Sequence, residues 1–388
     1  MENSKKMLLS NQLSFGILGA LEAAWAPMAP FVKSGLNLDD AQFGQLLLSI
    51  GLGSIIALPT VGPLISRFGP RLIAMLSCMT LAISLVCVTF SSSVIFMSVM
   101  LAIFGASLIG VDVASNVNAV VMESIFKRPL MSGFHGGYSF GTIVGALFVA
   151  MLLTVGLNIQ ASSILLLIVM GSLTLWGLRP LVKDVKEFNQ EQVATKEQTT
   201  KKHKFAFPAV IFVLGVLCFI MYGSEGALLH WGAVFATQNR GINPEVAGYF
   251  YLFFAFAMTI TRFTGNKIVT KCGRCRTVVV GAIMVGFGFI ITAFLENSFG
   301  MMLGFTLIGL GAGNIVPQLV SFAGTIKGIK VQSAISVINA LGYSGILLAP
   351  VIVGHISNLS SLEISFAVLG TAVFFVAFVS FLILRRKA

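Results

Sequence analysis

Residues 71–122 read RLIAMLSCMTLAISLVCVTFSSSVIFMSVMLAIFGASLIGVDVASNVNAVVM. Two apolar runs, 71–90 and 94–122, lie on either side of three serines, and Asp112 is the only charged side chain after Arg71. An apolar run of about 20 residues is long enough to cross the hydrocarbon core of a bilayer as a helix. The stretch therefore predicts two consecutive membrane-spanning helices joined by a short turn.

The same pattern extends over the whole chain of 388 residues, which is 56% hydrophobic and 10% charged with a mean hydropathy of +0.95. About a quarter of the residues of a soluble domain are charged, so a soluble protein is excluded. We expect an all-α integral membrane protein with twelve transmembrane helices. The predicted spans are 10–33, 42–65, 71–90, 94–122, 131–154, 160–178, 206–236, 246–268, 275–295, 299–323, 331–354 and 363–384.

The net charge of +11 has an uneven distribution. If the N-terminus is inside, all lysines and arginines except Lys33, Arg240 and Arg262 fall in the termini and loops of the inner side. Positively charged loops stay in the cytoplasm, so both termini are expected there. The charge is thus a topology signal and no sign of nucleic-acid binding. We expect a multi-pass protein of the plasma membrane, in a bacterium the inner membrane, and a monomer.

The longest hydrophilic segment, 179–204, divides the chain into two halves. We expect an N-terminal six-helix bundle at 1–178, a cytoplasmic linker at 179–204 and a C-terminal six-helix bundle at 205–388. Several landmarks recur at one constant offset: Trp25, Gly35, Asn37 and Ala41 reappear as Trp231, Gly241, Asn243 and Ala247. A parallel repeat of six helices predicts two bundles with a central cavity between them.

A narrower signal lies after the second span, where residues 62–71 read Gly-Pro-Leu-Ile-Ser-Arg-Phe-Gly-Pro-Arg. This loop resembles the signature G-x-x-x-D-R-x-G-R-[RK] of the major facilitator superfamily, with Ser66 at the aspartate position and Thr270 at that position in the second half. The resemblance implies two bundles that alternate in access, with spans one, four, seven and ten around the cavity. Missing aspartates put the family's cytoplasmic latch in doubt. The candidate cytoplasmic gate residues are Arg67, Gly69, Arg71, Glu123, Lys271 and Gly273, and Glu123 is alternatively a loop salt bridge to Lys127 or Arg128.

Three carboxylates lie within otherwise apolar spans: Glu22 in the first, Asp112 in the fourth and Glu225 in the seventh. A charge near the bilayer centre costs roughly 3 kcal/mol or more on insertion, so such residues usually serve function. A carboxyl group in a medium of low dielectric constant can take up and release a proton near neutral pH. We therefore predict proton coupling through these three residues. The structural alternatives are a hydrogen-bonded role for Asp112 and helix breaks near Glu22 and Glu225.

Candidate substrate-binding residues share the same spans or lie near them. Asn116 and Asp112 lie on one helix face, as do Asn314 and Gln318. The full set of candidates is Asn116, Trp25, His135, Tyr138, Asn314, Gln318 and Trp231. The two tryptophans are alternatively interfacial anchors, and His230 is expected at a wet interface. The segment 112–116, Asp-Val-Ala-Ser-Asn, resembles the acidic-x-x-x-Asn motif of the fucose-permease-like branch, whose members are sugar–proton symporters.

One span carries a stripe of small residues, Gly133, Gly137, Gly141 and Gly145. Small residues at this spacing allow close helix packing in lipid. The stripe is interpreted either as fixed packing or as a sliding contact between the two bundles.

Together these features favour a secondary transporter that works by proton-coupled symport of a small polar solute, with the lipid bilayer, protons and that solute as its partners. A proton-coupled antiporter that exports drugs or metabolites is the alternative. A membrane receptor or enzyme is disfavoured, because the chain has no clustered catalytic set and no nucleotide-binding motif. Cys272 and Cys275 have no further ligands nearby for zinc, so no metal or cofactor is expected. The identity of the solute does not follow from the sequence.

Overall fold

The computed structural model describes residues 2–127, 130–183, 209–323, 326 and 331–385. This part of the chain is helical and contains no strand. Most of the predicted linker lies outside the described residues. The helices are α1 Glu2–Ala23, α2 Trp25–Gly35, α3 Asp40–Phe68, α4 Pro70–Phe90, α5 Val94–Phe126, α6 Met131–Thr154, α7 Ile159–Gly177, α9 Ala209–Arg240, α10 Pro244–Ala247, α11 Tyr249–Cys272, α12 Arg274–Phe294, α13 Ser298–Ala312, α14 Ile315–Ala323, α15 Val331–Leu359 and α16 Leu362–Arg385.

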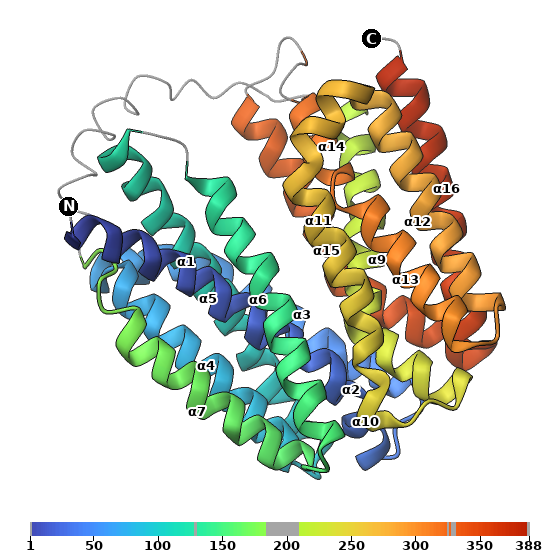
Figure 1. Ribbon diagram of the computed structural model, residues 1–388, viewed down its shortest axis with the longest axis horizontal. Helices are drawn as coiled ribbons and strands as arrows, with labels where there is room; N and C mark the ends of the chain where they lie inside the picture. The colour runs from blue at the N-terminus through green and yellow to red at the C-terminus, as the bar shows by residue number, and fades with distance from the viewer. Residues whose placement is uncertain (1, 128–129, 184–208, 324–325, 327–330, 386–388) are drawn as a thin grey trace. The chain divides into compact units, whose positions relative to one another are not determined.

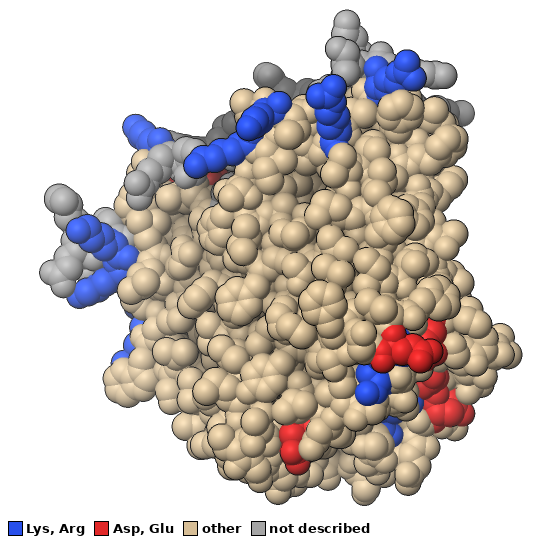
Figure 2. All heavy atoms as spheres, turned by 45° about the vertical axis from the view of Figure 1, so that its right-hand side comes forward, with Lys and Arg blue, Asp and Glu red and all other residues tan. Residues whose placement is uncertain are grey.

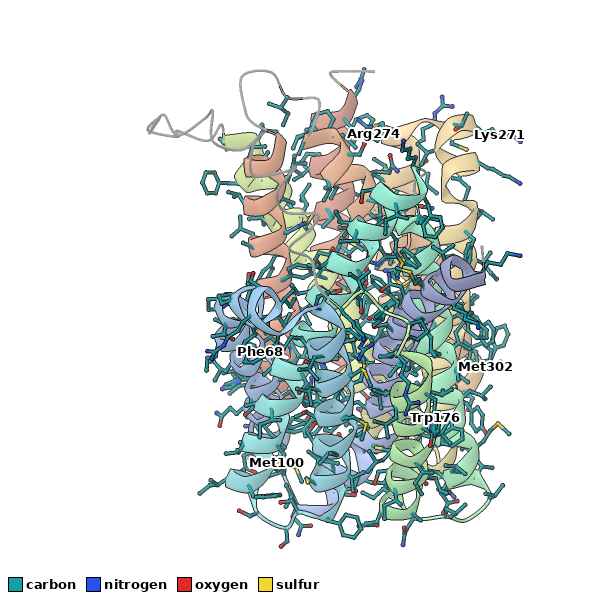
Figure 3. The ribbon with its side chains drawn as sticks, turned by 90° about the vertical axis from the view of Figure 1, so that its left-hand side faces the viewer. Phe68, Met100, Trp176, Lys271, Arg274 and Met302 are labelled. Atoms are coloured by element: carbon teal, nitrogen blue, oxygen red, sulfur yellow. The ribbon has the colours of Figure 1, made fainter. Side chains whose placement is uncertain are left out.

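Twelve segments of the described chain are long and apolar enough to cross a membrane, as predicted. Nine of them are single helices; the first span is formed by α1 and α2, the eighth by α10 and most of α11, and the tenth by α13 and α14. Large apolar side chains stand exposed on the outside of these helices, and Figure 3 labels two of them, Phe68 at 47% and Trp176 at 69% exposure. Exposed apolar surface on this scale suits contact with lipid.

The helices form two compact units (Figure 1). The first unit consists of Met1–Ala24 and Ser49–Ala206, and the second of Trp25–Leu48 and Phe207–Ala388. The first boundary coincides with the break between α1 and α2, just before Pro27, which cannot donate a backbone hydrogen bond. The segment 25–48, which comprises α2, a turn and the start of α3, therefore packs with the helices that follow it by more than 150 residues; we call it the hairpin.

In the first unit, α1 and α6 approach each other through small residues. A Cβ atom on Gly141 would lie 2.8 Å from the carbonyl carbon of Gly16, and one on Gly145 would lie 2.5 Å from the Cα of Ala20. These are backbone contacts between two helices of one unit. Gly141 and Gly145 are thus packed inside one unit, so the alternative of a sliding contact between bundles is wrong for these two residues. An added Cβ at Gly133 meets nothing within 4 Å, so this residue takes no part in the packing.

The loops after the second and the eighth span have one backbone shape. Gly69 has φ 81° and ψ 152°, and Gly273 has φ 80° and ψ 155°. This region of φ and ψ is populated almost only by glycine. The internal repeat read from the sequence is therefore preserved in the backbone of these two turns.

The second unit is polarised in charge along its helices. Lys271, Arg274 and Arg276 lie at the junction of α11 and α12, whereas Glu296 and Glu363 lie at the other end of this unit, before α13 and at the start of α16. Figure 2 shows most basic side chains gathered at one end of this face and the acidic ones toward the other, where basic side chains also lie beside them. Figure 3 labels Lys271 and Arg274 at the basic end.

Candidate functional site

The first unit holds a polar cluster made of Glu22, Tyr138, Asp112 and Asn116. The hydroxyl of Tyr138 donates to Glu22 Oε2 over 2.7 Å. Asn116 Nδ2 donates to Asp112 Oδ1 over 3.0 Å and to the backbone oxygen of Asp112 over 2.9 Å. Glu22 and Asp112 lie near enough for their negative charges to repel each other. Within the described chain, neither carboxylate pairs with a lysine or an arginine.

The close approach of α1 and α6 is what brings Tyr138 to Glu22. A Cβ atom on Gly19 would lie 3.1 Å from the carbonyl carbon of Tyr138 and 3.0 Å from the amide nitrogen of Thr142. The absence of a side chain at position 19 therefore lets the two backbones meet one turn from the carboxylate. The α5 helix is joined to α1 nearby, where the hydroxyls of Ser14 and Ser115 share a hydrogen bond of 2.5 Å.

The break expected near Glu22 is present at Ala24, but Tyr138 is the partner of this carboxylate, on another helix. His135, one turn before Tyr138, is exposed and its ring lies 5.1 Å from that of Phe15. The sequence indicated both α6 residues as candidates, and the structure brings Tyr138 into the cluster.

The second unit holds a different arrangement, in which a carboxylate is paired with a cation. Glu225 on α9 lies 3.8 Å from Arg262 on α11, measured from Oε2 to Nη2. Beside Glu225, the rings of Tyr222 and Tyr343 stack with centroids 5.3 Å apart. The helix α9 runs unbroken through Glu225, so the expected Gly-flanked break at this residue is wrong.

The partnership of Glu225 with Arg262 was missed by sequence reasoning, which noted Arg262 only as a basic residue outside the inner loops and termini. Both residues lie about midway along their helices. Since an isolated charge at that depth is costly in lipid, two opposite charges at matching depth on consecutive spans are a signal for an ion pair.

The polar residues of the tenth span have partners in the second unit. Asn314 lies at the break between α13 and α14, is 7% exposed, and donates to the backbone oxygen of Thr261 over 3.1 Å. Gln318 accepts from Arg274 Nε over 3.4 Å. In this conformation both side chains join helices to one another, and their roles toward a solute stay predictions.

The two repeat-related tryptophans are buried. Trp25 is 1% exposed and Trp231 is 0% exposed, with the indole of Trp231 donating to the backbone oxygen of Pro350 over 3.2 Å. Neither ring has a free face on which a solute could stack in this conformation. The expectation that His230 is wet is wrong, because it is 6% exposed and its ring lies 6.4 Å from that of Trp25.

The candidate gate residues contact their own units. Arg71 Nη1 donates to the backbone oxygen of Arg179 over 3.0 Å, which ties the signature loop to the end of the sixth span. Arg67 lies over the ring of Phe68, and neither it nor Lys271 forms an ion pair with any residue that the structure describes. Their role as a gate stays a prediction.

Glu123 closes the turn between α5 and α6. Its Oε1 accepts from the backbone nitrogens of Leu130 at 2.7 Å and Met131 at 3.0 Å. An acidic group is favourable at a helix N-terminus, where backbone N–H groups have no partner. The salt bridge expected for Glu123 is not made with Lys127, and Arg128 lies outside the described residues.

Comparisons with known proteins agree with this architecture. A protein 37% identical over 359 residues, which cover 92% of this chain and 91% of that protein, is an uncharacterized MFS-type transporter of Yersinia pestis. The membrane protein MosC of Rhizobium meliloti is 26% identical over 89% of this chain and 82% of its own length. The crystal structure of the nucleoside transporter NupG has the same fold, with a TM-score of 0.76 over 98% of both chains and 12% identity.

A family model described as Major Facilitator Superfamily matches residues 13–265 and 231–388. The twelve spans, the repeated loop shape and the full-length relative all agree with this match. The chain is a multi-pass membrane transporter and no enzyme, and it belongs to the major facilitator superfamily.

Proposed function

We propose that this transporter moves a small polar solute by alternating access and couples that movement to protons. The observation that carries the proposal is the cluster in the first unit, where Glu22 and Asp112 lie within spans and no described lysine or arginine neutralises them. Two nearby carboxylates repel each other when both are ionised, so uptake of a proton relieves the repulsion. The cluster is therefore suited to bind and release a proton during the cycle.

The two carboxylates differ in where their hydrogen-bond donors lie. Glu22 receives its hydrogen bond from Tyr138, a residue of another helix, whereas Asp112 receives its own from Asn116 on the same helix. Protonation of Glu22 would thus alter a hydrogen bond that joins α1 to α6, whereas protonation of Asp112 would alter one within α5. A proton can shift a conformational equilibrium only if it binds one conformation more tightly than the other.

The pair in the second unit is the proposed partner for the solute. Glu225 and Arg262 together offer an acceptor and donors, and at 3.8 Å their contact is longer than a hydrogen bond. The exposed fraction is 37% for the Arg262 side chain and 18% for that of Glu225. A polar solute that has both donors and acceptors could bridge the two groups. Desolvation of these opposite charges would cost less than desolvation of a site whose charges all have the same sign. The resemblance of residues 112–116 to sugar–proton symporters makes sugars the first class to test.

The orientation follows from the positive-inside rule. We place the basic end of the second unit, with Lys271 and Arg274, in the cytoplasm, and both termini on that side. The hairpin, at the opposite end of its unit, then faces outward. In a bacterial cell the protein would lie in the inner membrane.

Two steps test the proposal. Thermal-shift measurements of the purified protein against sugars, amino acids, nucleosides and cationic drugs first identify a solute that binds. Uptake of that solute is then measured in proteoliposomes with and without an inward proton gradient. We expect the gradient to accelerate uptake in the parent protein, and Glu22→Gln and Asp112→Asn to abolish the acceleration. The control is Glu296→Gln, an exposed carboxylate in the turn before α13.

Equal rates of uptake with and without the gradient in the parent protein would overturn proton coupling.

The second candidate function is export of drugs or metabolites, and the direction of coupled flux distinguishes it from symport. Two carboxylates without a paired cation also suit a lipophilic cation, which would leave against incoming protons. Antiport therefore predicts that an inward proton gradient accelerates efflux of a cationic drug and slows its uptake.

A further inference from the structure

A set of five buried polar side chains lies inside the first unit, where α1 and α5 meet. Ser10, Asn11 and Ser14 lie on α1, and Ser115 and Asn118 lie on α5; each is at most 2% exposed. The hydroxyls of Ser14 and Ser115 share the hydrogen bond that joins the two helices. We call these five residues the buried polar set.

The two asparagines of this set differ in how they are bonded. Asn118 Nδ2 donates to the backbone oxygen of Ala114 over 2.9 Å, and Asn118 Oδ1 accepts from the backbone nitrogen of Val182 over 3.0 Å. Neither Nδ2 nor Oδ1 of Asn11 has a partner among the described residues, and the same holds for the hydroxyl of Ser10. Asn118 therefore fastens the chain that follows α7, whereas Asn11 has no such structural task.

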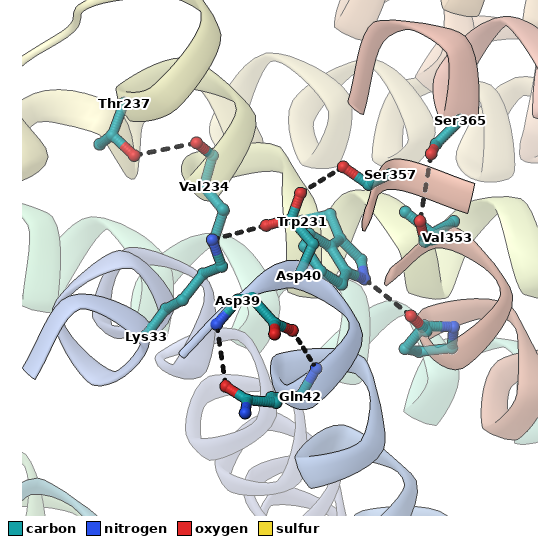
Figure 4. Close-up of polar contacts among 11 residues, drawn as sticks. Lys33, Asp39, Asp40, Gln42, Trp231, Val234, Thr237, Val353, Ser357 and Ser365 are labelled. Carbon is teal, nitrogen blue, oxygen red and sulfur yellow. Dashed lines mark hydrogen bonds and ion pairs between the residues drawn. The ribbon is translucent and has the colours of Figure 1, made fainter. Parts of the chain in front are cut away.

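Unpartnered buried groups of this kind are the exception, because buried polar atoms normally find a hydrogen-bond partner. In the second unit, the deeply buried Lys33 lies 2.6 Å from Asp40, and the indole of Trp231 donates to a backbone oxygen (Figure 4). Among the described residues, Asn11 is the only buried amide side chain whose donor and acceptor atoms both lack a partner. Together with Ser10 it offers an amide group and a hydroxyl to a bound molecule.

The unpartnered atoms indicate which molecule fits. A cation would satisfy the carbonyl oxygen of Asn11 but would face the hydrogens on its Nδ2, and an anion would meet the opposite conflict. Water both donates and accepts, so it satisfies both groups. Buried waters typically make about three hydrogen bonds to polar groups of this kind. The chemistry of the buried polar set therefore favours water over an ion.

The buried polar set lies between the N-terminal end of α1 and Asp112. Since α1 and α5 belong to the first and the fourth spans, they run in opposite directions, so Asn11 and Asp112 lie on opposite sides of the serine pair. One turn before Asn11, the side chain of Met7 is already partly exposed.

The gaps along this line are short. Asn11 and Ser14 are three residues apart, as are Ser115 and Asp112, and this spacing brings two side chains of a helix to about 5–6 Å. One water can bridge each gap, because two hydrogen bonds of about 2.8 Å cover that distance.

We propose that the buried polar set holds a chain of waters, and that this chain delivers protons to Asp112 from the end of the unit that carries the N-terminus. The water beside Asn11, the hydroxyls of Ser14 and Ser115, and the water beside Asp112 form the route. Each of these groups takes up one proton and gives up another, so the net change is one proton on Asp112. The route rests on the proton coupling of the proposed function and runs inside one bundle.

The titratable groups around the end of the route are few. Glu22 of α1 acts on Asp112 through its charge, and Tyr138 of α6 is bonded to Glu22. No lysine or arginine of the described chain pairs with either carboxylate. A proton that arrives at Asp112 therefore relieves the repulsion from Glu22 and displaces no other cation.

The first test asks whether Asn11 is bound by water. Asn11→Leu keeps the shape of the side chain but removes its donor and its acceptor. Loss of bound water should lower the melting temperature of the purified protein by about 2–4 °C. In a dry site the same variant removes two unsatisfied buried groups, so the melting temperature would rise. The matched control is Asn118→Leu, which breaks two hydrogen bonds to the backbone and should lower the melting temperature as well.

Sodium is the competing occupant, and the same measurement decides against or for it. The melting temperature of the parent protein should be equal in sodium chloride and in choline chloride. A higher value in sodium chloride that is lost in Asn11→Leu would assign a cation to the site and overturn the water chain.

The second test follows the proton itself. Time-resolved infrared spectroscopy of the purified protein after light-triggered release of protons detects protonated carboxyl groups, and the band that disappears in Asp112→Asn reports on Asp112. Ser115→Ala breaks the pair with Ser14, so this band should appear about tenfold more slowly. The matched control is Ser163→Ala, which breaks the buried 2.9 Å pair with Thr89 between α7 and α4 and should keep the parent rate.

A slower band in Ser115→Ala with Ser163→Ala at the parent rate, and a lowered melting temperature of Asn11→Leu, support the water chain. A parent-like rate in Ser115→Ala, equal slowing in Ser163→Ala, or a raised melting temperature of Asn11→Leu overturns it. If Ser115→Ala does not fold, Asn11→Leu takes its place in the infrared measurement. Neither test needs a solute or a gradient, so their failure is distinguishable from uptake that is equal with and without a proton gradient, which overturns proton coupling.

Discussion

Gly145→Ala should destabilise the first unit by an amount that follows from the contact of α1 with α6. The new Cβ would lie 2.5 Å from both the Cα and the carbonyl carbon of Ala20, whereas ordinary contact begins at 3.4 Å. The backbone oxygen of Ala20 would lie nearer still. The helices must therefore separate by at least about 0.9 Å at this point, because backbone atoms cannot rotate away. Overpacking costs typically 1–3 kcal/mol, and this case belongs near the upper end, at about 3 kcal/mol.

Alanine also stabilises a helix by about 1 kcal/mol relative to glycine, so the expected net loss is about 2 kcal/mol. For a unit of this size that corresponds to a fall in melting temperature of about 4–8 °C. The measurement is thermal unfolding of the purified protein in detergent, followed by intrinsic fluorescence or by loss of the monodisperse peak.

The matched control lies on the same stripe, three turns earlier. An added Cβ at Gly133 meets nothing within 4 Å, so Gly133→Ala causes no clash. The higher helix propensity of alanine should then raise the melting temperature by about 2–4 °C. Opposite signs for the two variants are the expected result. Equal shifts, or a Gly145→Ala protein as stable as the parent, would refute the reasoning that Gly145 is packed inside the unit.

Three further predictions follow from individual contacts. Tyr138→Phe removes the hydrogen bond to Glu22, of a kind worth about 1.5–3 kcal/mol, so proton-driven uptake should fall about tenfold while counterflow without a gradient is kept. Glu225→Gln leaves Arg262 without its carboxylate and should lower the melting temperature, and adding Arg262→Gln should restore most of the loss. Gly273→Ala places a side chain at φ 80° and ψ 155°. It should lower the free energy of unfolding by about 1–3 kcal/mol, which thermal unfolding would measure.

The number and order of spans could be predicted because hydrophobic length alone determines them. Loop 62–71 was sufficient to predict the family, whereas the two six-helix halves expected from the repeat of Trp25 as Trp231 stay a prediction. Glu22 and Asp112 were identified for a physical reason as well, since charges within spans are expensive. These signals are local in the sequence, and a single chain displays them fully.

What could not be predicted depends on how helices meet. By position, Trp25 and His230 read as interfacial residues. The contact between the hairpin, which carries Trp25, and α9, which carries His230, buries both side chains. The exchange of segment 25–48 into the second unit leaves no mark in composition or periodicity. Asn314 indicated a cavity by its polarity, yet it bonds to Thr261 because the tenth span is broken at that point. Pairings between distant segments require the three-dimensional arrangement.

The matching turns at Gly69 and Gly273 have a consequence for how the two loops can be exchanged. Around them the two halves keep few identical side chains, while φ and ψ differ by only a few degrees. The shape of each turn therefore depends on its glycine more than on the side chains beside it. Each loop should then accept the side chains of the other, provided that its glycine is retained.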